Sequence, residues 1–301
     1  MNSCFLYPGQ GSQKVGMADF LASDKEAIDL IQQADNILNL NLSKLIFEGP
    51  FEELTLTKNA QPALLAVGYA AHKHWVKKYK LQPIAAAGHS LGEYTALAAA
   101  GSISYEEALK TVKKRGEVMQ DAVANQDGGM VALLGEGRLN DLLESCEGSD
   151  CLVPANFNTL NQTVLSGDVN AIDRVVGKAK DFGYKAIKLK VSAPFHSPLM
   201  KKAKERMDKV INEIDISPPK WPVASNFTGF FHEENSSVIK KNLINQIEGS
   251  VKWVQNLKEL AKLNFEGWLD VGPGKVLFNM IPKNDSRKKI NHFNVVGDII
   301  R

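Results

Sequence analysis

The chain contains little cysteine and no long apolar segment, and each absence excludes a class of protein. Cys4, Cys146 and Cys151 are its only cysteines, and their odd number and spacing fit neither a disulfide framework nor a metal site. We therefore expect a reducing, cytoplasmic setting. No stretch is apolar for long enough to cross a bilayer, and the segment from Met1 to Tyr7 lacks the basic start of a signal peptide. We expect no membrane association.

The chain also lacks a strong excess of charge. Its 36 basic and 34 acidic residues leave a net charge of +2, with no basic stripe of the kind that nucleic-acid-binding proteins carry. We expect no nucleic-acid partner. There is no internal repeat or low-complexity tract, and nothing demands more than a monomer. What the chain does have is 44% apolar residues over 301 positions, enough for a large core in one or two domains.

Strand and helix patterns alternate along most of the chain. Residues 4–7 form a predicted strand that ends at Pro8-Gly9, and helical patterns follow to about residue 80. Another helix is predicted after Ser104, because Ser104 and Glu107 have the spacing of a capping box. Residues 268–271 form a further predicted strand. This alternation favours an α/β fold with a mostly parallel sheet.

The middle of the chain has a different pattern. Its predicted order is strand, helix, two strands around a polar asparagine-rich turn, helix and strand, which is the ferredoxin-like arrangement. We therefore predict a small inserted α+β domain at residues 126–191, and a large α/β catalytic domain made of residues 1–125 and 192–301. In the latter, Ser197 and Pro198 are predicted to begin a helix that runs to about Ile214.

Ser90 is the strongest candidate for a catalytic residue. It lies in Gly88-His89-Ser90-Leu91-Gly92, between a short apolar strand and a run of helix formers. A G-x-S-x-G sequence between a strand and a helix is typical of a nucleophile elbow. Glycines permit the sharp turn, and the start of the helix leaves backbone N–H groups that can hold an oxyanion. The alternative is a serine that only caps the helix.

Arg115 lies at an unusual position on the helix after Ser104. On a helical wheel it falls beside Ala108, Val112 and Met119, at the edge of the apolar stripe. An arginine there must find an anion or extend its head into water. One interpretation is therefore an arginine that reaches solvent or a structural carboxylate. The other is a clamp for a substrate carboxylate, which a guanidinium binds with two parallel hydrogen bonds.

A serine nucleophile needs a base, and His196 is the best-placed histidine. It follows a predicted strand and precedes the helix at Ser197, and active sites collect at strand ends in open α/β sheets. A solvated loop histidine is the alternative. We interpret His89 as structural, because neighbours on a tight turn point apart. The remaining histidines are predicted to lie in polar surroundings, at a helix end or in loops: His72, His74, His232 and His292.

Taken together, these residues resemble a known family. The motif around Ser90, continued by Glu93-Tyr94, is similar to the nucleophile motif of malonyl-CoA:acyl carrier protein transacylases. The resemblance is collinear from residue 5 to about residue 280. Its other motifs are Pro8-Gly9-Gln10-Gly11-Ser12-Gln13, Arg115 with Met119-Gln120, Gly129 to Gly135, Ala155-Asn156-Phe157-Asn158, Gln162 to Gly167, Ala193 to Met200, Gln246 with Val251-x-Trp253, and Val271-Gly272-Pro273-Gly274.

The resemblance implies a role for each matching position. Ser90 would be the nucleophile and His196 its base, with a carbonyl at Gln246 orienting the imidazole. Backbone N–H groups of Gln10 and Leu91 would form the oxyanion hole. Arg115 would bind the malonyl carboxylate, on a helix that also carries Met119, while the bulk of Leu91 and Phe195 resembles that of malonyl-selective members.

The family also implies a hydrolase-like core and a reaction that moves a malonyl group from malonyl-CoA to the phosphopantetheine thiol of acyl carrier protein. It implies no metal and no bound cofactor, with fatty acid synthesis as the default pathway.

Two loops depart from the family pattern, and two other functions stay open. The departures are Thr159-Leu160-Asn161 and Gly249-Ser250, so the role of Gln246 is less firmly implied than those of Ser90, Arg115 and His196. A serine ester or thioester hydrolase has the same elbow, and a trans-acting polyketide acyltransferase has the same motifs. A non-catalytic binding module would not need all three side chains. Lys188, Lys190, Lys201, Lys202 and Lys204 are candidates for contacts with an acidic carrier protein, or an ordinary solvated face.

Overall fold

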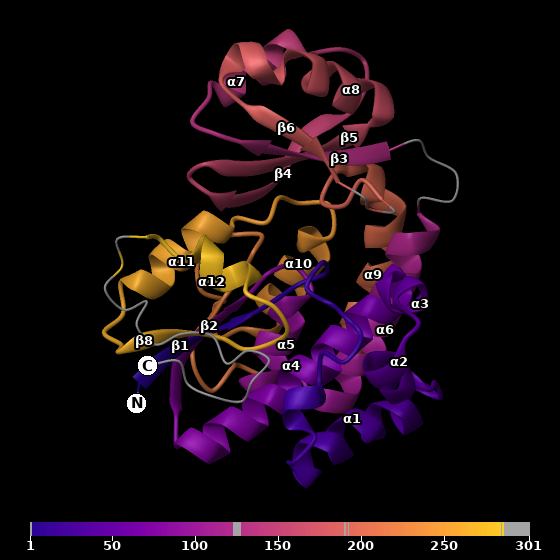
Figure 1. Cartoon of the computed structure of the whole chain (residues 1–301), viewed down its shortest axis with the longest axis vertical. Helices are drawn as coiled ribbons and strands as arrows, with labels where there is room; N and C mark the ends of the chain where they lie inside the picture. Colours follow the sequence, from indigo (N-terminus) through magenta and orange to yellow (C-terminus); the bar gives the residue numbers. More distant parts are fainter. Residues whose placement is uncertain (1, 123–127, 190, 192, 284, 286–301) are drawn as a thin grey trace.

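The computed structural model describes residues 2–122, 128–189, 191, 193–283 and 285. Its larger part is an α/β unit around a parallel sheet with strand order β7-β2-β1-β8. Figure 1 shows this sheet in the lower half of the molecule, with helices packed around it. The four strands are β1 (Asn2–Tyr7), β2 (Gln82–Gly88), β7 (Val223–Ala224) and β8 (Gly267–Asp270). The fold class predicted from the alternating pattern, α/β with a mostly parallel sheet, is confirmed.

The strands of this sheet bury both faces. Phe5 and Tyr7 on β1 point into the larger of two apolar clusters, whereas Cys4 and Leu6 point into the other, as the two-residue period of a strand requires. A strand buried on both sides needs a continuous apolar run, and residues 4–7 have one. The helices are α1 (Lys25–Leu38), α2 (Leu42–Glu48), α3 (Phe51–Thr55), α4 (Thr57–Tyr79), α5 (Gly92–Ala99), α6 (Tyr105–Asp121), α9 (Lys201–Glu213), α10 (Ser236–Gln246), α11 (Trp253–Ala261) and α12 (Val276–Met280).

The helix start predicted at Ser104 is confirmed, but the Glu107 carboxylate accepts from the Ser104 hydroxyl and not from its backbone N–H, so the motif is a serine cap and not a full capping box. Ser104 Oγ accepts a hydrogen bond from the Glu107 N–H at 3.1 Å, and it contacts the Glu107 carboxylate at 2.9 Å. The cap fixes where α6 begins, and so which of its residues face the core. One of the inward residues is Arg115, on the side of α6 that packs against α4.

A second, antiparallel sheet lies above the first in Figure 1. Its strand order is β4-β5-β3-β6, and two helices, α7 and α8, follow β3 and β5 in the chain. The elements are β3 (Gly128–Leu134), α7 (Leu139–Ser145), β4 (Leu152–Thr159), β5 (Gln162–Asp168), α8 (Val169–Lys178) and β6 (Lys185–Lys188). The predicted junctions at 125/126 and 191/192 involve residues 123–127 and 192, which lie outside the described residues, so they stay predictions.

The second sheet presents its two faces to different surroundings. Val131, Leu133 and Leu165 pack with α7 and α8 in their own apolar cluster. Met130 and Val164 point the other way and join the core of the larger unit. Since alternate residues of a strand point to opposite faces, the helices cover one face of this sheet and the other face turns toward the parallel sheet. This second face forms one wall of the site described below.

Two local predictions were wrong. The asparagine-rich segment is part of strand β4, which continues to Thr159, and the turn is only Leu160-Asn161. Ser197 does not cap α9: its hydroxyl donates to the Pro194 carbonyl at 2.7 Å, and a short 3₁₀ turn at residues 198–200 precedes the helix. A serine hydroxyl can bond backward to a carbonyl as readily as forward to an N–H. Here the backward bond closes the loop that holds His196.

No described helix combines the length and the apolar composition needed to span a bilayer.

Candidate active site

Ser90 lies on a sharp turn between β2 and α5. Its backbone has φ of +52°, in the left-handed region that non-glycine residues rarely adopt. Glycines on both sides make the turn possible: a Cβ on Gly88 would lie 1.8 Å from the Gly92 carbonyl carbon, and a Cβ on Gly92 would lie 2.0 Å from the Tyr7 oxygen. The Ser90 N–H donates to the Asn226 side-chain oxygen at 2.6 Å. This hydrogen bond stabilises the turn. A strained backbone at such a position is typical of functional residues.

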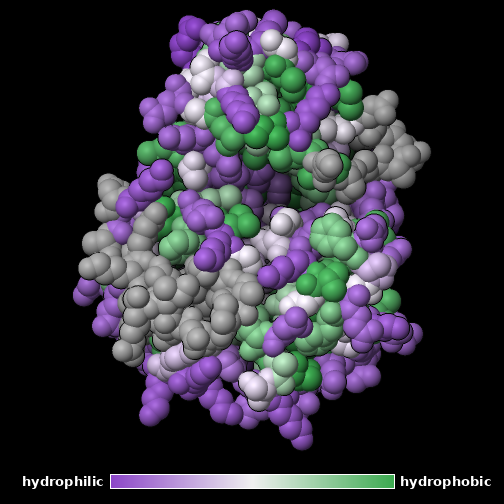
Figure 2. All heavy atoms as spheres, in the orientation of Figure 1, coloured by the Kyte–Doolittle hydropathy of each residue, from purple (hydrophilic) through white to green (hydrophobic). Residues whose placement is uncertain are grey.

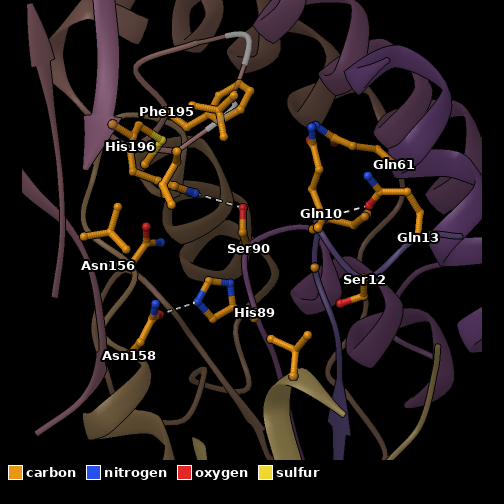
Figure 3. Close-up of a pocket in the computed structure, with 18 of the residues that line it drawn as sticks. Gln10, Ser12, Gln13, Gln61, His89, Ser90, Asn156, Asn158, Phe195 and His196 are labelled. Carbon is orange, nitrogen blue, oxygen red and sulfur yellow. Dashed lines mark hydrogen bonds between the residues drawn. The ribbon is translucent and has the colours of Figure 1, made fainter. Parts of the chain in front are cut away.

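His196 faces Ser90 across the site, as Figure 3 shows, with its Nε2 at 2.9 Å from the serine Oγ. The other ring nitrogen, Nδ1, contacts the backbone carbonyls of Gln246 at 2.8 Å and Gly249 at 3.2 Å. A carbonyl can only accept, so Nδ1 carries the proton and Nε2 is free to accept one from the serine. The orienting group at Gln246 is thus the backbone carbonyl. Gly249, where the sequence departs from the family pattern, supplies a second backbone carbonyl to His196. Because this carbonyl belongs to the backbone, another residue at this position would supply it too.

The surroundings of His196 keep its imidazole neutral. The side chain is buried, and this burial, together with the positive charge of Arg115, lowers the pKa of His196 to about 3. Burial disfavours the charged form and a nearby cation disfavours it further. At neutral pH the ring is therefore unprotonated and able to take the proton of Ser90.

Arg115 is buried, with 1% of its surface exposed. Its Nη2 donates to Ser90 Oγ and to the Gln246 side-chain oxygen, both at 3.0 Å, and its Nη1 donates to the Gln61 side-chain oxygen at 2.8 Å. The interpretation of an arginine that extends its head into solvent is therefore wrong, because the guanidinium is buried and points into the site. Burial lowers the pKa of Arg115, but a guanidinium stays charged in proteins. The site thus contains a desolvated cation beside the nucleophile.

Gln61 was missed in the sequence. It lies in α4, 1% exposed, and its amide contacts Arg115 on one side and the Met119 sulfur at 3.8 Å on the other. The available signal was a polar residue within an otherwise apolar stretch, Gln61-Pro62-Ala63-Leu64-Leu65. A buried amide needs partners, and here these partners belong to the site.

The two predicted oxyanion donors border the same space. Gln10 and Leu91 both line the cavity at Ser90, and within the described residues neither backbone N–H donates to an acceptor. Leu91 directly precedes α5, where helical N–H groups have no intrahelical partner. The Gln10 side chain is held by Thr57 at 3.1 Å. Two N–H groups without acceptors beside a serine hydroxyl are what an oxyanion hole requires.

A cavity of about 260 Å³ connects these groups. Ser90, His196, Arg115, Met119 and Phe195 all line it, whereas Gln246 lies beneath its floor. Figure 2 shows the surface hollowed between the upper part, built on the second sheet, and the rest of the molecule. The structure therefore brings the predicted site residues into one place, although they come from segments up to 236 positions apart in the printed numbering, from Gln10 to Gln246.

The second sheet contributes a polar wall to the cavity. Asn156 and Asn158 point into it from β4, and His89 Nε2 contacts the Asn158 side-chain oxygen at 2.8 Å (Figure 3). Asn158 in turn donates to the Gln162 side chain at 2.9 Å. His89 thus has a structural contact, as predicted, and that contact joins the elbow to the second sheet.

The other described histidines contradict the prediction of polar surroundings. His72 is buried and contacts the Tyr7 hydroxyl at 2.7 Å, and His74 is paired with Asp24. His232 is also buried and pairs with Glu93 at 2.8 Å. His292 lies outside the described residues. Each buried histidine has a specific partner that is distant in sequence, which is why the local pattern did not reveal it.

The arrangement supports nucleophilic acyl transfer at Ser90. It contains a serine hydroxyl, one neutral and oriented imidazole beside it, and backbone N–H donors, and serine acyl-transfer chemistry uses these groups as nucleophile, base and oxyanion hole. The orienting group distinguishes it from common hydrolases, because two carbonyls take the place of the acid. Among the described residues, no carboxylate contacts His196, and no cluster of three potential metal ligands occurs.

Comparison with known proteins places this site in context. The model of the acyl transferase domain family matches residues 4–301. A malonyl CoA-acyl carrier protein transacylase of Bacillus subtilis (strain 168) is 41% identical over 290 residues, which cover 95% of this chain and 91% of that protein.

Solved structures agree over nearly the whole chain. An acyl-carrier-protein S-malonyltransferase from Burkholderia pseudomallei 1710b superposes with a TM-score of 0.93 at 35% identity, covering 99% of this chain and 97% of that one. A structure of a type II polyketide synthase acyl-carrier protein in complex with its malonyl-transacylase matches with a TM-score of 0.92 at 31% identity, covering 99% and 97%.

Proposed function

Because this chain belongs to the acyl transferase family, we propose that it is an S-malonyltransferase: it moves the malonyl group of malonyl-CoA to the phosphopantetheine thiol of acyl carrier protein. The observation that carries the proposal is the position of Arg115, a buried cation that donates to the nucleophile Ser90. A short acyl group bound to Ser90 and ending in a carboxylate would bring that carboxylate within reach of the guanidinium. A neutral acyl group has no carboxylate that could accept hydrogen bonds from Arg115.

The first half of the reaction acylates Ser90. The serine oxygen attacks the thioester carbonyl while Nε2 of His196 takes its proton. The backbone N–H groups of Gln10 and Leu91 donate to the oxyanion, and the loss of one such donor typically costs about 10²–10³ in rate. When the tetrahedral intermediate collapses, the proton on His196 passes to the sulfur of coenzyme A, which leaves as a thiol. A malonyl ester of Ser90 remains.

The second half reverses these steps with another thiol. The phosphopantetheine thiol of the carrier protein enters after coenzyme A has left, and His196 takes its proton as the sulfur attacks the ester. The proton then returns to Ser90 Oγ as the ester bond breaks. The mechanism is ping-pong, because one cavity serves both thiols in turn. Coenzyme A is a substrate here and no resident cofactor takes part.

The cavity walls favour a small acyl group. Leu91 and Phe195 flank the nucleophile and the base, and Met119 lies against Gln61 beside Arg115. Arg115 supplies the positive charge beside these side chains, where the carboxylate of a malonyl group would lie. We therefore expect malonyl to be preferred over acetyl, which has no carboxylate, and over methylmalonyl, which has an extra branch.

We also infer that the second sheet with α7 and α8 is a ferredoxin-like domain. The order β-α-β-β-α-β and the strand order β4-β5-β3-β6 support this inference. A monomer in the cytoplasm stays our prediction, and the odd number of cysteines supports a reducing compartment.

For the carrier protein we propose a docking face near Lys201 and Lys202 at the start of α9. Lys188 is paired with Asp173 and Lys204 with Glu248, so these two lysines are less suited to contact a carrier protein. Lys190 lies outside the described residues.

Intact-mass spectrometry after brief exposure to malonyl-CoA tests the proposal. We expect the protein to gain the mass of one malonyl group, with the modified peptide containing Ser90, and we expect the Ser90→Ala variant to gain nothing. Adding a carrier protein with its phosphopantetheine arm should remove the label from the enzyme and place it on the carrier. A label that passes to water as fast as to the carrier thiol would instead identify a hydrolase. Absence of any label on Ser90 would refute the proposal.

Fatty acid synthesis is the pathway we assign, and a trans-acting polyketide acyltransferase is the alternative. Both perform the same chemistry and differ in the carrier protein that they serve. Rates with a fatty-acid carrier protein and a polyketide carrier protein distinguish the two.

A further inference from the structure

A group of buried polar side chains lies directly beneath the elbow and does not line the cavity. Its members come from three distant segments. Glu93 lies in the first turn of α5, Asn226 and His232 lie between β7 and α10, and Gln246 lies at the end of α10. Glu93, Asn226 and Gln246 are 0% exposed and His232 is 6% exposed. A buried carboxylate is costly unless hydrogen bonds satisfy it, so the partners of Glu93 show what its position achieves.

Glu93 accepts hydrogen bonds from three of these neighbours. Its Oε2 accepts from the Gln246 side-chain amide at 2.6 Å and from the Asn226 N–H at 3.0 Å. Its Oε1 accepts from His232 Nε2 at 2.8 Å. Both oxygens are therefore occupied, and the carboxylate joins the loop after β7 to the end of α10.

The bond to Gln246 determines which way its side-chain amide points. The Nε2 of Gln246 faces Glu93 and also donates to the Ser90 carbonyl at 3.0 Å. The Gln246 side-chain oxygen must then face Arg115, whose Nη2 donates to it at 3.0 Å. A reversed amide would place an NH₂ group against the guanidinium, donor against donor. The backbone carbonyl of the same residue holds His196, so Gln246 is bonded to Ser90, Arg115 and His196.

His232 supports the carboxylate from the far side. With its Nε2–H donated to Glu93, its Nδ1 accepts from the Asn242 side-chain amide at 3.3 Å. Asn242 and Gln246 lie one turn apart on α10, so His232 connects Glu93 to the helix that carries Gln246.

We propose that Glu93, supported by His232, is a positioning residue for acyl transfer: its hydrogen bonds fix the Gln246 amide and thereby the places of Arg115 and His196. This inference rests on the proposed malonyl transfer. It assigns Glu93 a role through hydrogen-bond geometry, so a side chain of the same shape that keeps an oxygen toward Gln246 and Asn226 should preserve the role.

Two substitutions at Glu93 separate that role from bulk stability. Glu93→Ala removes the carboxylate that accepts from Gln246, Asn226 and His232. The Gln246 NH₂ group then keeps only the Ser90 carbonyl at 3.0 Å and the Asn226 side-chain oxygen at 3.5 Å as acceptors. Glu93→Gln keeps an oxygen for Gln246 and Asn226, and its NH₂ group can donate to His232 Nε2 if the imidazole moves its proton to Nδ1 and the Asn242 amide rotates to accept it. We therefore expect E93A to be impaired and E93Q to be close to wild type.

The readout is competition between malonyl-CoA and acetyl-CoA in one reaction with the carrier protein, because the product ratio does not depend on how much enzyme is folded. For E93A we expect malonyl transfer to fall by about 10- to 100-fold, the size of effect found when a partner that orients a metal ligand is lost. The malonyl-to-acetyl ratio should fall with it, because displacement of Arg115 also removes a carboxylate interaction that only the malonyl group can make. His232→Ala should change the ratio in the same direction by less.

Asp24 and His74 provide the matched control. They form another carboxylate–histidine pair, with side chains that are 21% and 9% exposed, and Asp24 also caps α1, away from the cavity. Asp24→Ala should lower the thermal stability without changing the malonyl-to-acetyl ratio.

Three results would overturn the inference: an E93A ratio equal to wild type, an E93Q ratio as low as that of E93A, or a ratio changed equally by D24A. The wild-type arm tests the proposed function separately, because a wild-type protein that moves no malonyl group refutes that function before any variant is compared.

Discussion

Arg115 provides the sharpest test of how the site recognises its substrate. The Arg115→Ala variant removes the guanidinium and leaves Ser90, His196 and the backbone donors in place. The guanidinium is 1% exposed, and three of its N–H donations are made to Gln61, Ser90 and Gln246. Its Nε has no hydrogen-bond partner within the described residues. The group therefore has donor capacity left for a substrate carboxylate.

The expected loss of malonyl transfer in the Arg115→Ala variant follows from this burial. Removing one partner of a desolvated, hydrogen-bonded charge pair costs about 2–5 kcal/mol, which corresponds to about 30- to 5,000-fold in kcat/KM. The R115A variant also loses the hydrogen bonds to Ser90, Gln61 and Gln246, and this loss affects malonyl and acetyl transfer alike. It cancels in the ratio of the two, so the change in the ratio reports the carboxylate interaction alone.

The assay is again a competition between the two thioesters, with the malonyl- and acetyl-carrier products separated by mass spectrometry. We expect the ratio to fall by at least about 30-fold in R115A. Arg115→Lys should recover only part of it, because an ammonium keeps the charge but not the two parallel donors. An R115A ratio equal to that of wild type would refute the clamp and would leave Arg115 as a structural partner of Gln61 and Gln246.

The remaining predictions concern catalysis, packing and pH. His196→Ala should slow acylation of Ser90 by about 10²–10⁴-fold, measured by intact mass in a quenched time course; an unchanged rate would mean another base acts. Gly92→Ala should lower the melting temperature strongly, because its Cβ would meet the Tyr7 oxygen at 2.0 Å, whereas Gly177→Ala, with no atom within 4 Å, should not. Burial raises the pKa of Asp270 to about 7, so the folded state binds this proton more tightly than the unfolded chain and the carboxyl destabilises the fold as pH rises. Asp270→Asn should therefore be more stable than wild type at pH 8, with the gain shrinking by about 1.4 kcal/mol per pH unit as pH falls from about 7 toward 4; urea unfolding at several pH values measures it, and a gain independent of pH would contradict this explanation.

Local pattern was sufficient for most of the helices and strands and for the sharp turn at Ser90. The elbow at Ser90 depends on contiguous residues, two glycines and a strand followed by a helix, and the structure shows why each glycine is needed. The serine cap at Ser104 is likewise a contact between residues three apart. Interactions over so short a span depend little on the rest of the fold.

Local pattern failed where a polar side chain has a distant partner. Gln61 and His232 look like ordinary helix and loop residues in the sequence, yet both are buried and bonded to residues 54 and 139 positions away. Ser197 was predicted to cap a helix, but its hydroxyl bonds backward to Pro194. Several partners are chemically possible for each polar group, and the tertiary packing determines which one is used.

The sequence by itself determined the alternation of strands and helices, the sharp turn at Ser90 and the presence of a candidate base and a candidate cation, because these follow from periodicity, turn chemistry and residue type. Only the tertiary structure decided that Arg115 points inward to Ser90, that backbone carbonyls orient His196, and that Glu93 lies behind Gln246. These contacts join segments more than twenty residues apart, and their geometry is set by the way the helices pack on the sheet.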